Sequence, residues 1–166
     1  MVIESLNHHW LVTIKGVAGI GKTTLAWELC HHFFIRNTFK SGILYVPLMN
    51  CLKTERVFEL LWNEMSPQLG MVKMQSKLEK TIVHHLNLQK FEILIVLDNT
   101  EDILNADGEM FKIEIGKLID ACSNVKILVT SREAIDKLEH VKEFPIDIDV
   151  LSPLLSASLL KSHITD

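Results

Sequence analysis

The strongest constraint on this chain is a glycine-rich run at residues 16–24, which reads G-V-A-G-I-G-K-T-T. The run matches the phosphate-binding loop pattern G-x-x-x-x-G-K-[ST] at every fixed position. Residues 10–14 before it are mostly apolar and predict a buried strand, while residues 24–34 after it favour a helix and lack glycine and proline. A strand, this loop and a helix in that order predict an α/β domain that binds a polyphosphate.

The residue types of the loop suit a bound phosphate. Gly16, Gly19 and Gly21 lack a Cβ atom, so the backbone can take positive φ and approach an anion closely. The N–H groups of the loop and the N-terminus of the following helix then point toward the phosphates. Lys22 supplies a cation for the terminal phosphates. Thr23 supplies a hydroxyl that can bind Mg²⁺.

A glycine-rich turn that precedes a lysine by chance is the alternative interpretation. Average composition produces the four fixed positions by accident in roughly one per cent or fewer of chains of this length. The flanking strand and helix lower that chance further. We therefore predict that the nucleotide contacts come from Gly16, Val17, Ala18, Gly19, Ile20, Gly21, Lys22, Thr23 and Thr24.

Length and composition fit one globular domain, since the 166 residues are 48% hydrophobic and 23% charged. The formal net charge of −4 provides no broad basic surface, which argues against nucleic acid as a partner. No apolar run approaches the length that crosses a membrane, and polar residues interrupt the N-terminus where a signal peptide would be apolar. The three widely spaced cysteines, without a C-x-x-C pair, predict reduced thiols. We expect a cytoplasmic protein.

Apolar strands and helices alternate along the chain. Strands are expected at residues 10–14, 43–49, 92–97, 126–130 and 143–148. Helices are expected at residues 22–34, 54–65, 75–88, 109–122, 133–138 and 152–162. This alternation predicts an α/β fold in which helices cover both faces of a five-stranded parallel sheet. In such sheets ligands bind beyond the carboxyl ends of the strands.

Asp98 directly follows the strand expected at residues 92–97. An apolar strand that ends in aspartate downstream of a phosphate loop resembles the Walker B element, whose carboxylate holds Mg²⁺, usually through a water. An isolated aspartate after a strand is more often a solvated turn residue. The upstream loop favours the metal, so we predict that Thr23 and Asp98 hold Mg²⁺ together.

Asn99 follows Asp98. ATPases with an extra strand between the two Walker strands usually have an acidic residue here, which activates the attacking water. An amide can orient a water but cannot accept its proton, so slow or absent hydrolysis is expected. Glu101 and Asp102 are the carboxylates that could replace the missing one. The run N-T-E-D also resembles the guanine-reading N-K-x-D motif, but it lacks the lysine and follows the wrong strand.

Arg132 ends a T-S-R run that follows the strand expected at residues 126–130. At the carboxyl end of a strand its guanidinium could bind a γ-phosphate through two hydrogen bonds. A surface arginine beside a helix is the alternative.

Together these motifs resemble the nucleotide-binding domain of the NB-ARC family. The extended loop G-x-G-K-T-T-L-A at residues 19–26, the strand ending in Asp98 and the T-S-R at residues 130–132 occur in the family's order and spacing. Residues 151–154, L-S-P-L, resemble the segment that opens the next helical subdomain. Members of this family are signal-transduction ATPases of the STAND class, found among plant resistance proteins and apoptotic scaffold proteins.

The resemblance implies a P-loop NTPase fold in which a sensor strand separates the Walker A and Walker B strands. It implies a nucleotide-binding domain over residues 1–150 and the start of a truncated helical subdomain over residues 151–166. It further implies a switch with ATP or ADP and Mg²⁺ as cofactors. ADP would hold a closed form, and ATP would open a form that oligomerises and recruits protein partners through domains missing from this chain. Lys22, Asp98 and Arg132 would act on the nucleotide, with Arg132 sensing the γ-phosphate.

A catalytically active P-loop enzyme, either an ATPase or a small-molecule kinase, is the alternative function. Kinases of this class usually carry an arginine-rich lid, yet no arginine lies between Asp98 and Val125. This absence counts against a kinase.

Overall fold

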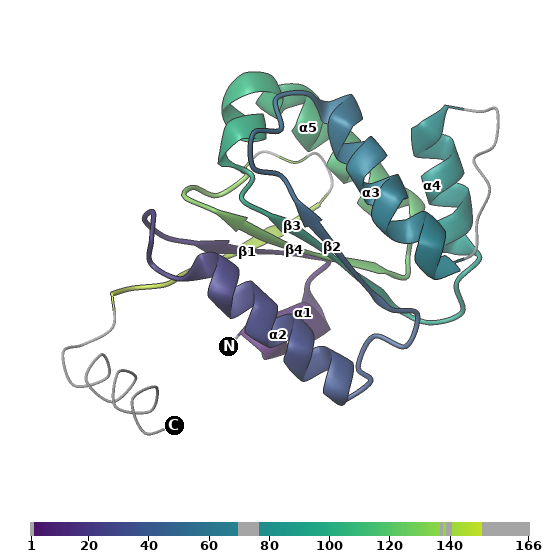
Figure 1. Ribbon diagram of the computed structural model, residues 1–166, viewed down its shortest axis with the longest axis horizontal. Helices are drawn as coiled ribbons and strands as arrows, with labels where there is room; N and C mark the ends of the chain where they lie inside the picture. Colours follow the sequence, from purple (N-terminus) through teal and green to yellow (C-terminus); the bar gives the residue numbers. More distant parts are fainter. Residues whose placement is uncertain (1, 70–76, 137, 139–140, 151–166) are drawn as a thin grey trace.

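Five parallel strands form the centre of the structure, a computed structural model that describes residues 2–69, 77–136, 138 and 141–150. Figure 1 shows the sheet with helices above and below it. The elements in chain order are α1 (Val2–His8), β1 (Leu11–Lys15), α2 (Lys22–Ile35), β2 (Ile43–Pro47), α3 (Thr54–Leu69), α4 (Leu78–Asn87), β3 (Ile93–Asp98), α5 (Glu101–Ala121), β4 (Val125–Ser131) and β5 (Glu143–Asp147).

The strand order in the sheet is β2-β3-β4-β1-β5. Strand β4 therefore lies between β1, which precedes the phosphate loop, and β3, which ends in Asp98. Leu128 at the middle of β4 pairs with Val12 on one side and with Val96 on the other. The predicted five-stranded parallel sheet and the predicted separation of the two Walker strands by the sensor strand are confirmed.

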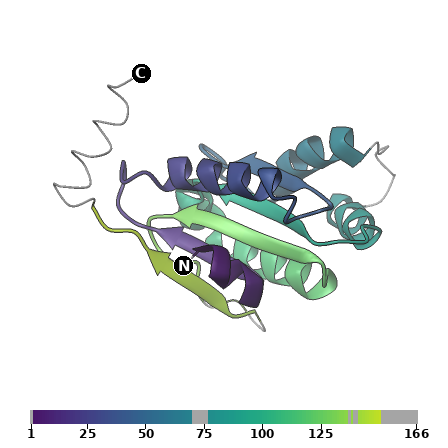
Figure 2. The same ribbon diagram turned by 90° about the horizontal axis from the view of Figure 1, so that it is seen from below.

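Helices cover both faces of the sheet, which explains why the central strands are apolar along their whole length. Figures 1 and 2 show α1 and α2 on one face, and α3, α4 and α5 on the other. Because successive side chains of a strand point to opposite faces, β3 contributes to two separate cores. Ile93, Ile95 and Leu97 pack on the α3–α5 side. Leu94 and Val96 pack on the α2 side.

Several predicted boundaries move. Helix α3 runs past Pro67 to Leu69, and strand β2 ends at Pro47 instead of reaching residue 49. Proline is tolerated there because β2 is an edge strand, so the missing N–H removes no ladder hydrogen bond on the open side. The short helix α1 has no counterpart among the predicted elements.

Helix α5 starts much earlier than the predicted residue 109. Asp107 interrupts it with non-helical φ and ψ of −145° and 34°, so two helical stretches meet at a kink. The Asp107 carboxylate accepts hydrogen bonds from the backbone N–H and the hydroxyl of Thr54, at 2.9 and 2.7 Å. These two hydrogen bonds lower the pKa of Asp107. The kink thus ties α5 to the start of α3.

The predicted helix at residues 133–138 is wrong for the part that the structure describes, because Glu133–Asp136 have no helical hydrogen bonding. The backbone N–H groups of Ile135 and Asp136 instead donate to the two carboxylate oxygens of Glu143, both at 2.9 Å. A side chain from β5 therefore replaces the expected helical turn. The predicted helix at residues 152–162 lies outside the described residues.

Cys30, Cys51 and Cys122 are all free thiols, as predicted. Burial raises the pKa of Cys122 to about 11. Burial and the nearby Asp98 raise the pKa of Cys30 to about 11. Within residues 2–69, 77–136, 138 and 141–150, none of the helices combines the length and the apolar character needed to cross a membrane.

Candidate nucleotide-binding site

The loop between β1 and α2 has the conformation that a phosphate-binding loop requires. Gly19 and Gly21 have φ of 75° and 102°, values that side chains disfavour. Gly16 does not have a positive φ, so that part of the prediction is wrong for this glycine. The surrounding atoms leave no room for a side chain at residue 16. A Cβ atom there would lie 3.0 Å from both Cγ1 and the carbonyl oxygen of Ile148, and 3.1 Å from Ile20.

Lys22, the first residue of α2, is only 8% exposed. Its Nζ donates to the carbonyl oxygens of Gly16 and Val17, at 2.9 and 3.3 Å. The loop thus folds around its own lysine. Because helix N-termini carry N–H groups without intrahelical partners, α2 adds donors and a positive field at the same place.

Asp98 is buried at the end of β3 and receives three hydroxyl groups. Thr23 Oγ1 donates to its Oδ1 at 3.0 Å, and Thr130 Oγ1 donates to the same oxygen. Tyr45 Oη donates to Oδ2 at 2.6 Å. A carboxylate that is 5% exposed needs such partners, since an unpaired buried charge is costly. Burial and the hydrogen bond to Asp98 raise the pKa of Tyr45, which keeps its hydroxyl protonated as a donor.

Sequence reasoning missed Tyr45 and Thr130 as partners of Asp98. Thr130 belongs to the T-S-R run, but only the pairing of β4 beside β3 brings it to Asp98. Tyr45 is the only tyrosine of the chain, in a strand that is otherwise apolar. A hydroxyl in an otherwise apolar strand was the available signal that Tyr45 has a polar partner, but it does not identify that partner.

The residues present fit a Mg²⁺ ion. Thr23 and Asp98 place a hydroxyl and a carboxylate side by side, and Mg²⁺ prefers such oxygen ligands. Among the described residues no group of three or more His, Cys, Asp or Glu side chains gathers as a metal cage. A Mg²⁺ ion here would therefore take its other ligands from water and phosphate oxygens, as is usual for this metal.

In the polar segment after β3, the neighbouring side chains of Glu101 and Asp102 point in different directions. Asn99 has φ of 65°, and its N–H donates to Thr130 Oγ1 at 2.8 Å. Asp102 turns away and accepts a hydrogen bond from the Asn50 N–H at 2.8 Å. Glu101 turns toward the loop, where Oε1 lies 3.4 Å from Lys22 Nζ. Of the two carboxylates that could replace the missing acid after Asp98, only Glu101 lies beside the phosphate loop.

Arg132 lies at the same edge as the loop. Its Nε is 3.8 Å from Glu101 Oε1, and its side chain is 63% exposed. A cavity of about 300 Å³ opens here, lined by Ala18, Gly19, Gly21, Lys22, Thr23, Thr24, Asn99, Glu101 and Arg132. Most residues of the predicted phosphate loop therefore line the same cavity as Arg132. Gly16, Val17 and Ile20 do not line this cavity, and Asp98 lies behind Thr23.

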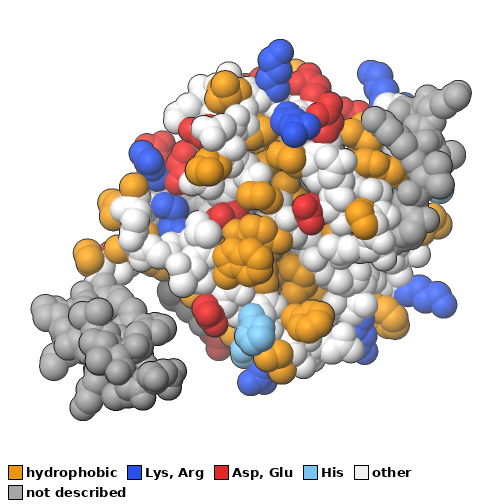
Figure 3. Space-filling view, in the orientation of Figure 1, with side chains coloured by type: hydrophobic (Ala, Val, Ile, Leu, Met, Phe, Trp, Pro, Cys, Tyr) orange, Lys and Arg blue, Asp and Glu red, His pale blue; other side chains and the backbone are white. Residues whose placement is uncertain are grey.

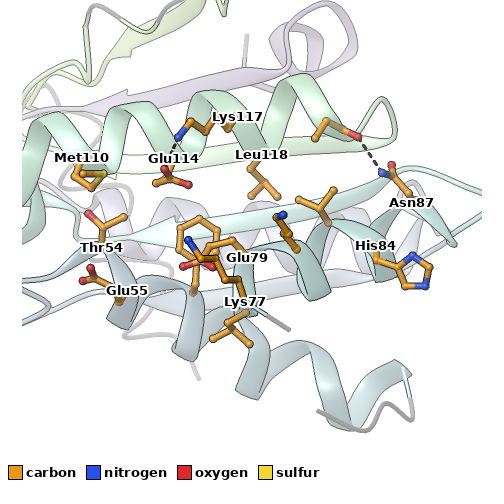
Figure 4. A pocket seen from close by; sticks show the side chains of 15 residues that line it. Thr54, Glu55, Lys77, Glu79, His84, Asn87, Met110, Glu114, Lys117 and Leu118 are labelled. Atoms are coloured by element: carbon orange, nitrogen blue, oxygen red, sulfur yellow. Dashed lines mark hydrogen bonds and ion pairs between the residues drawn. The ribbon is translucent and has the colours of Figure 1, made fainter. Parts of the chain in front are cut away.

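A larger hollow of about 990 Å³ lies between α3, α4 and α5. Figure 4 shows Glu55, Glu79, Lys77 and Lys117 around its rim. Its lining contains none of the predicted site residues. The carboxyl edge of the sheet is therefore the better candidate for nucleotide, because its donors suit an anion.

A parallel sheet with this loop and with β4 between β1 and β3 defines an α/β P-loop NTPase fold. Within that class, the chain belongs to the NB-ARC domain family, whose model matches residues 2–166.

Relatives include disease susceptibility protein LOV1 of Arabidopsis thaliana, which is 33% identical over 95 residues. That match covers 54% of this chain and 10% of LOV1. Regulatory protein AfsR of Streptomyces griseus is 28% identical over 143 residues, covering 84% of this chain and 13% of AfsR. The chain thus spans about a tenth of the length of these curated relatives.

Among solved structures, a chain of Drosophila ORC bound to DNA matches with a TM-score of 0.74 and 16% identity. The match covers 99% of this chain and 46% of that one. Cdc6p of Pyrobaculum aerophilum matches with a TM-score of 0.68 and 16% identity, covering 96% of this chain and 45% of that one. At this identity the likeness shows the fold alone, so the predicted lack of nucleic-acid binding stays a prediction. On the face of the molecule that Figure 3 shows, which is the one seen in Figure 1, the lysine and arginine side chains are dispersed and form no continuous patch.

Proposed function

We propose that this chain is the ATP- and ADP-binding switch domain of a signal-transduction ATPase, with slow hydrolysis at most. The observation that carries the proposal is the single cavity where Lys22, Thr23 and Arg132 meet. It combines a phosphate loop, a hydroxyl beside a buried carboxylate, and an arginine that directly follows β4. Such a site can respond differently to two nucleotides that differ by one phosphate.

In this proposal Gly16–Thr24 bind the phosphates, and Thr23 with Asp98 hold Mg²⁺. The metal, when bound, would neutralise charge on the phosphates. Arg132 senses the γ-phosphate. A ligand shifts a conformational equilibrium only by its differential affinity for the two states, and Arg132 provides a contact that ATP makes and ADP lacks.

Slow hydrolysis follows from Asn99. The first residue after Asp98 offers an amide, which cannot take a proton from water. The neighbouring carboxylate of Glu101 contacts Lys22 and Arg132. Among the residues that line the cavity, it is the carboxylate that could act as a general base, and the second candidate function below depends on it.

The family membership supports the wider parts of the proposal: a STAND-class switch in the cytoplasm, with protein partners recruited through other domains and with homo-oligomers in the ATP state. Residues 1–150 would be the nucleotide-binding domain, and residues 151–166 would begin a helical subdomain. No membrane or nucleic-acid partner is proposed. An active ATPase is the second candidate, favoured by the position of Glu101 in the cavity.

Calorimetric titration of ATP and ADP, with and without Mg²⁺, tests the proposal on the wild type and on Lys22→Ala. We expect binding by the wild type and a loss of at least about a hundredfold in the variant, since removing the partner of a buried phosphate contact costs several kcal/mol. Equal binding by both proteins would refute the assigned site.

A further inference from the structure

The Glu101 carboxylate occupies the space between the two cations of the cavity. Its Oε1 lies 3.4 Å from Lys22 Nζ and 3.8 Å from Arg132 Nε. The Glu101 and Lys22 side chains are 12% and 8% exposed, so their contact forms largely out of water, whereas the Arg132 side chain is 63% exposed and its contact is open to solvent. The second oxygen of Glu101, Oε2, is buried and accepts no hydrogen bond among the described residues.

We propose that Glu101 is an internal anion that competes with nucleotide phosphates for Lys22 and Arg132. It thereby weakens nucleotide binding, and it weakens ATP binding more than ADP binding. The inference rests on the proposed function, because it takes these two cations as the phosphate-binding groups. Glu101 acts as a specificity-determining residue of that site.

The charges of the cavity support this inference. Its lining holds two cations, Lys22 and Arg132, and one anion, Glu101. A carboxylate and a phosphate present the same kind of oxygen acceptor to lysine and arginine. A nucleotide that pairs with these cations must displace Glu101 from them, and the displaced carboxylate then faces another anion across a partly buried site. Both effects oppose binding.

The orientation of Glu101 sets it apart from an ordinary acidic residue at a helix start. Glu101 and Asp102 are both in the first turn of α5, where a carboxylate stabilises the helix dipole. Asp102 points away from the cavity and holds the Asn50 N–H. Helix stabilisation therefore requires no carboxylate inside the cavity, and Asp102 provides a matched control.

Glu101 is expected to weaken ATP binding more than ADP binding because it forms two separate ion pairs, one with Lys22 and one with Arg132. Under the proposed function Lys22 contacts the phosphates of both nucleotides, whereas Arg132 contacts only the γ-phosphate of ATP. Removing the Glu101 charge frees Lys22 for either ligand, but it frees Arg132 for ATP alone. The gain in affinity should consequently be larger for ATP.

The test compares Glu101→Gln with Asp102→Asn, which removes one negative charge from the same helical turn without entering the cavity. Calorimetric titrations with ATP and ADP in Mg²⁺ are run on both variants and on the wild type. We expect Glu101→Gln to bind ATP about tenfold tighter and ADP about threefold tighter, in line with a partly buried charge pair. Asp102→Asn should stay within about twofold of the wild type. Raising the salt concentration should reduce the gain.

Several outcomes would overturn the inference. If Glu101→Gln binds ATP no tighter than the wild type, while Lys22→Ala abolishes binding, Glu101 is not a competitor and the proposed nucleotide site still stands. A loss of Mg²⁺-dependent ATP binding in Glu101→Gln would make Glu101 a metal-binding group instead. If neither the wild type nor Glu101→Gln binds nucleotide, both proposals fail. Binding by Glu101→Gln alone would support the inference strongly.

A separate measurement checks that Glu101→Gln is folded. Lys22 keeps its hydrogen bonds to Gly16 and Val17 when the Glu101 charge is removed, so the variant should fold. Urea unfolding without nucleotide checks this. Glu101→Asp, which keeps the charge on a shorter side chain, should bind ATP with an affinity between those of the wild type and Glu101→Gln. ATP affinity equal to that of Glu101→Gln would mean that the gain does not come from the charge.

Discussion

Thr23 and Asp98, 75 positions apart in the chain, are joined by a hydrogen bond of 3.0 Å from the threonine hydroxyl to the carboxylate. The bond connects the first turn of α2 with the end of β3. It forms because β1, which leads into the loop and α2, and β3 both run parallel to β4 between them, so their carboxyl ends lie at the same edge of the sheet. The pair therefore places two oxygen ligands side by side at this edge of the sheet.

This pair predicts a Mg²⁺-dependent part of ATP binding. Thr23→Ala and Asp98→Asn should each reduce the gain in ATP affinity on adding Mg²⁺ by about tenfold, since each removes a metal ligand or its charge. Thr23→Ser, which keeps the hydroxyl, is the matched control and should retain most of the gain. Titrations of ATP with Mg²⁺ and with EDTA measure it. An unchanged gain in Thr23→Ala would place the metal elsewhere.

Arg132 predicts a difference between ATP and ADP. Arg132→Ala should lower ATP affinity by about tenfold and leave ADP affinity within about twofold, because only ATP carries the phosphate that this side chain is proposed to contact. Arg56, which pairs with Glu59 at 2.8 Å on the surface of α3, supplies the control Arg56→Ala. Equal losses for both nucleotides would make Arg132 an ordinary surface arginine.

A side chain at residue 16 should destabilise the fold through a steric clash. Gly16→Ala places a Cβ atom 3.0 Å from the Ile148 backbone, so it should destabilise the fold by about 1–3 kcal/mol. Gly108→Ala makes the same chemical change in α5, where a Cβ atom meets nothing within 4 Å. That control should be neutral or more stable by about 0.5–1 kcal/mol. Urea unfolding measures both. Similar effects for the two variants would contradict the steric explanation.

Local sequence was enough to predict the loop and the five strands, while the position of the sensor strand between the two Walker strands came from the family resemblance. Residues 16–24 and Asp98 belong to short motifs whose chemistry depends on neighbours in the chain. The role of Tyr45 was not predictable, because it depends on the pairing of β2 with β3 across 53 positions. The sequence named both Glu101 and Asp102 as candidates. Only the rotation of the first turn of α5 decides which of them faces the cavity.

Errors in the predicted elements have the same origin. Residues 133–138 favour a helix locally, but Glu143 from β5 binds the N–H groups of Ile135 and Asp136. A contact from a residue outside the predicted helix thus overrides local propensity. The start of α5 was missed for a related reason. Asp107 interrupts the helical pattern, and its contact with Thr54 stabilises a kink that no local rule anticipates.

Asn99 predicts that one added carboxylate restores turnover. Its φ of 65° lies in the left-handed region, which asparagine and aspartate tolerate better than most residues. Asn99→Asp therefore keeps the backbone and its N–H bond to Thr130, while it adds an acid that can accept a proton. A general base contributes roughly 10²–10⁴-fold, and we expect a rise of at least about tenfold in the rate of phosphate release.

Asn99→Gly is the matched control for this change, since glycine accepts the same φ and carries no side chain. Its rate should stay at or below that of the wild type, and it should bind ATP within about threefold of the wild type by calorimetry. Rates are compared at saturating ATP, because the added carboxylate of Asn99→Asp lies in the cavity and should weaken ATP binding. Rapid hydrolysis by the unmodified chain would contradict the role given to Asn99 and would favour Glu101 as the base. An unchanged rate in Asn99→Asp would mean that positioning of the water limits hydrolysis, because a base beside a misplaced water removes no proton.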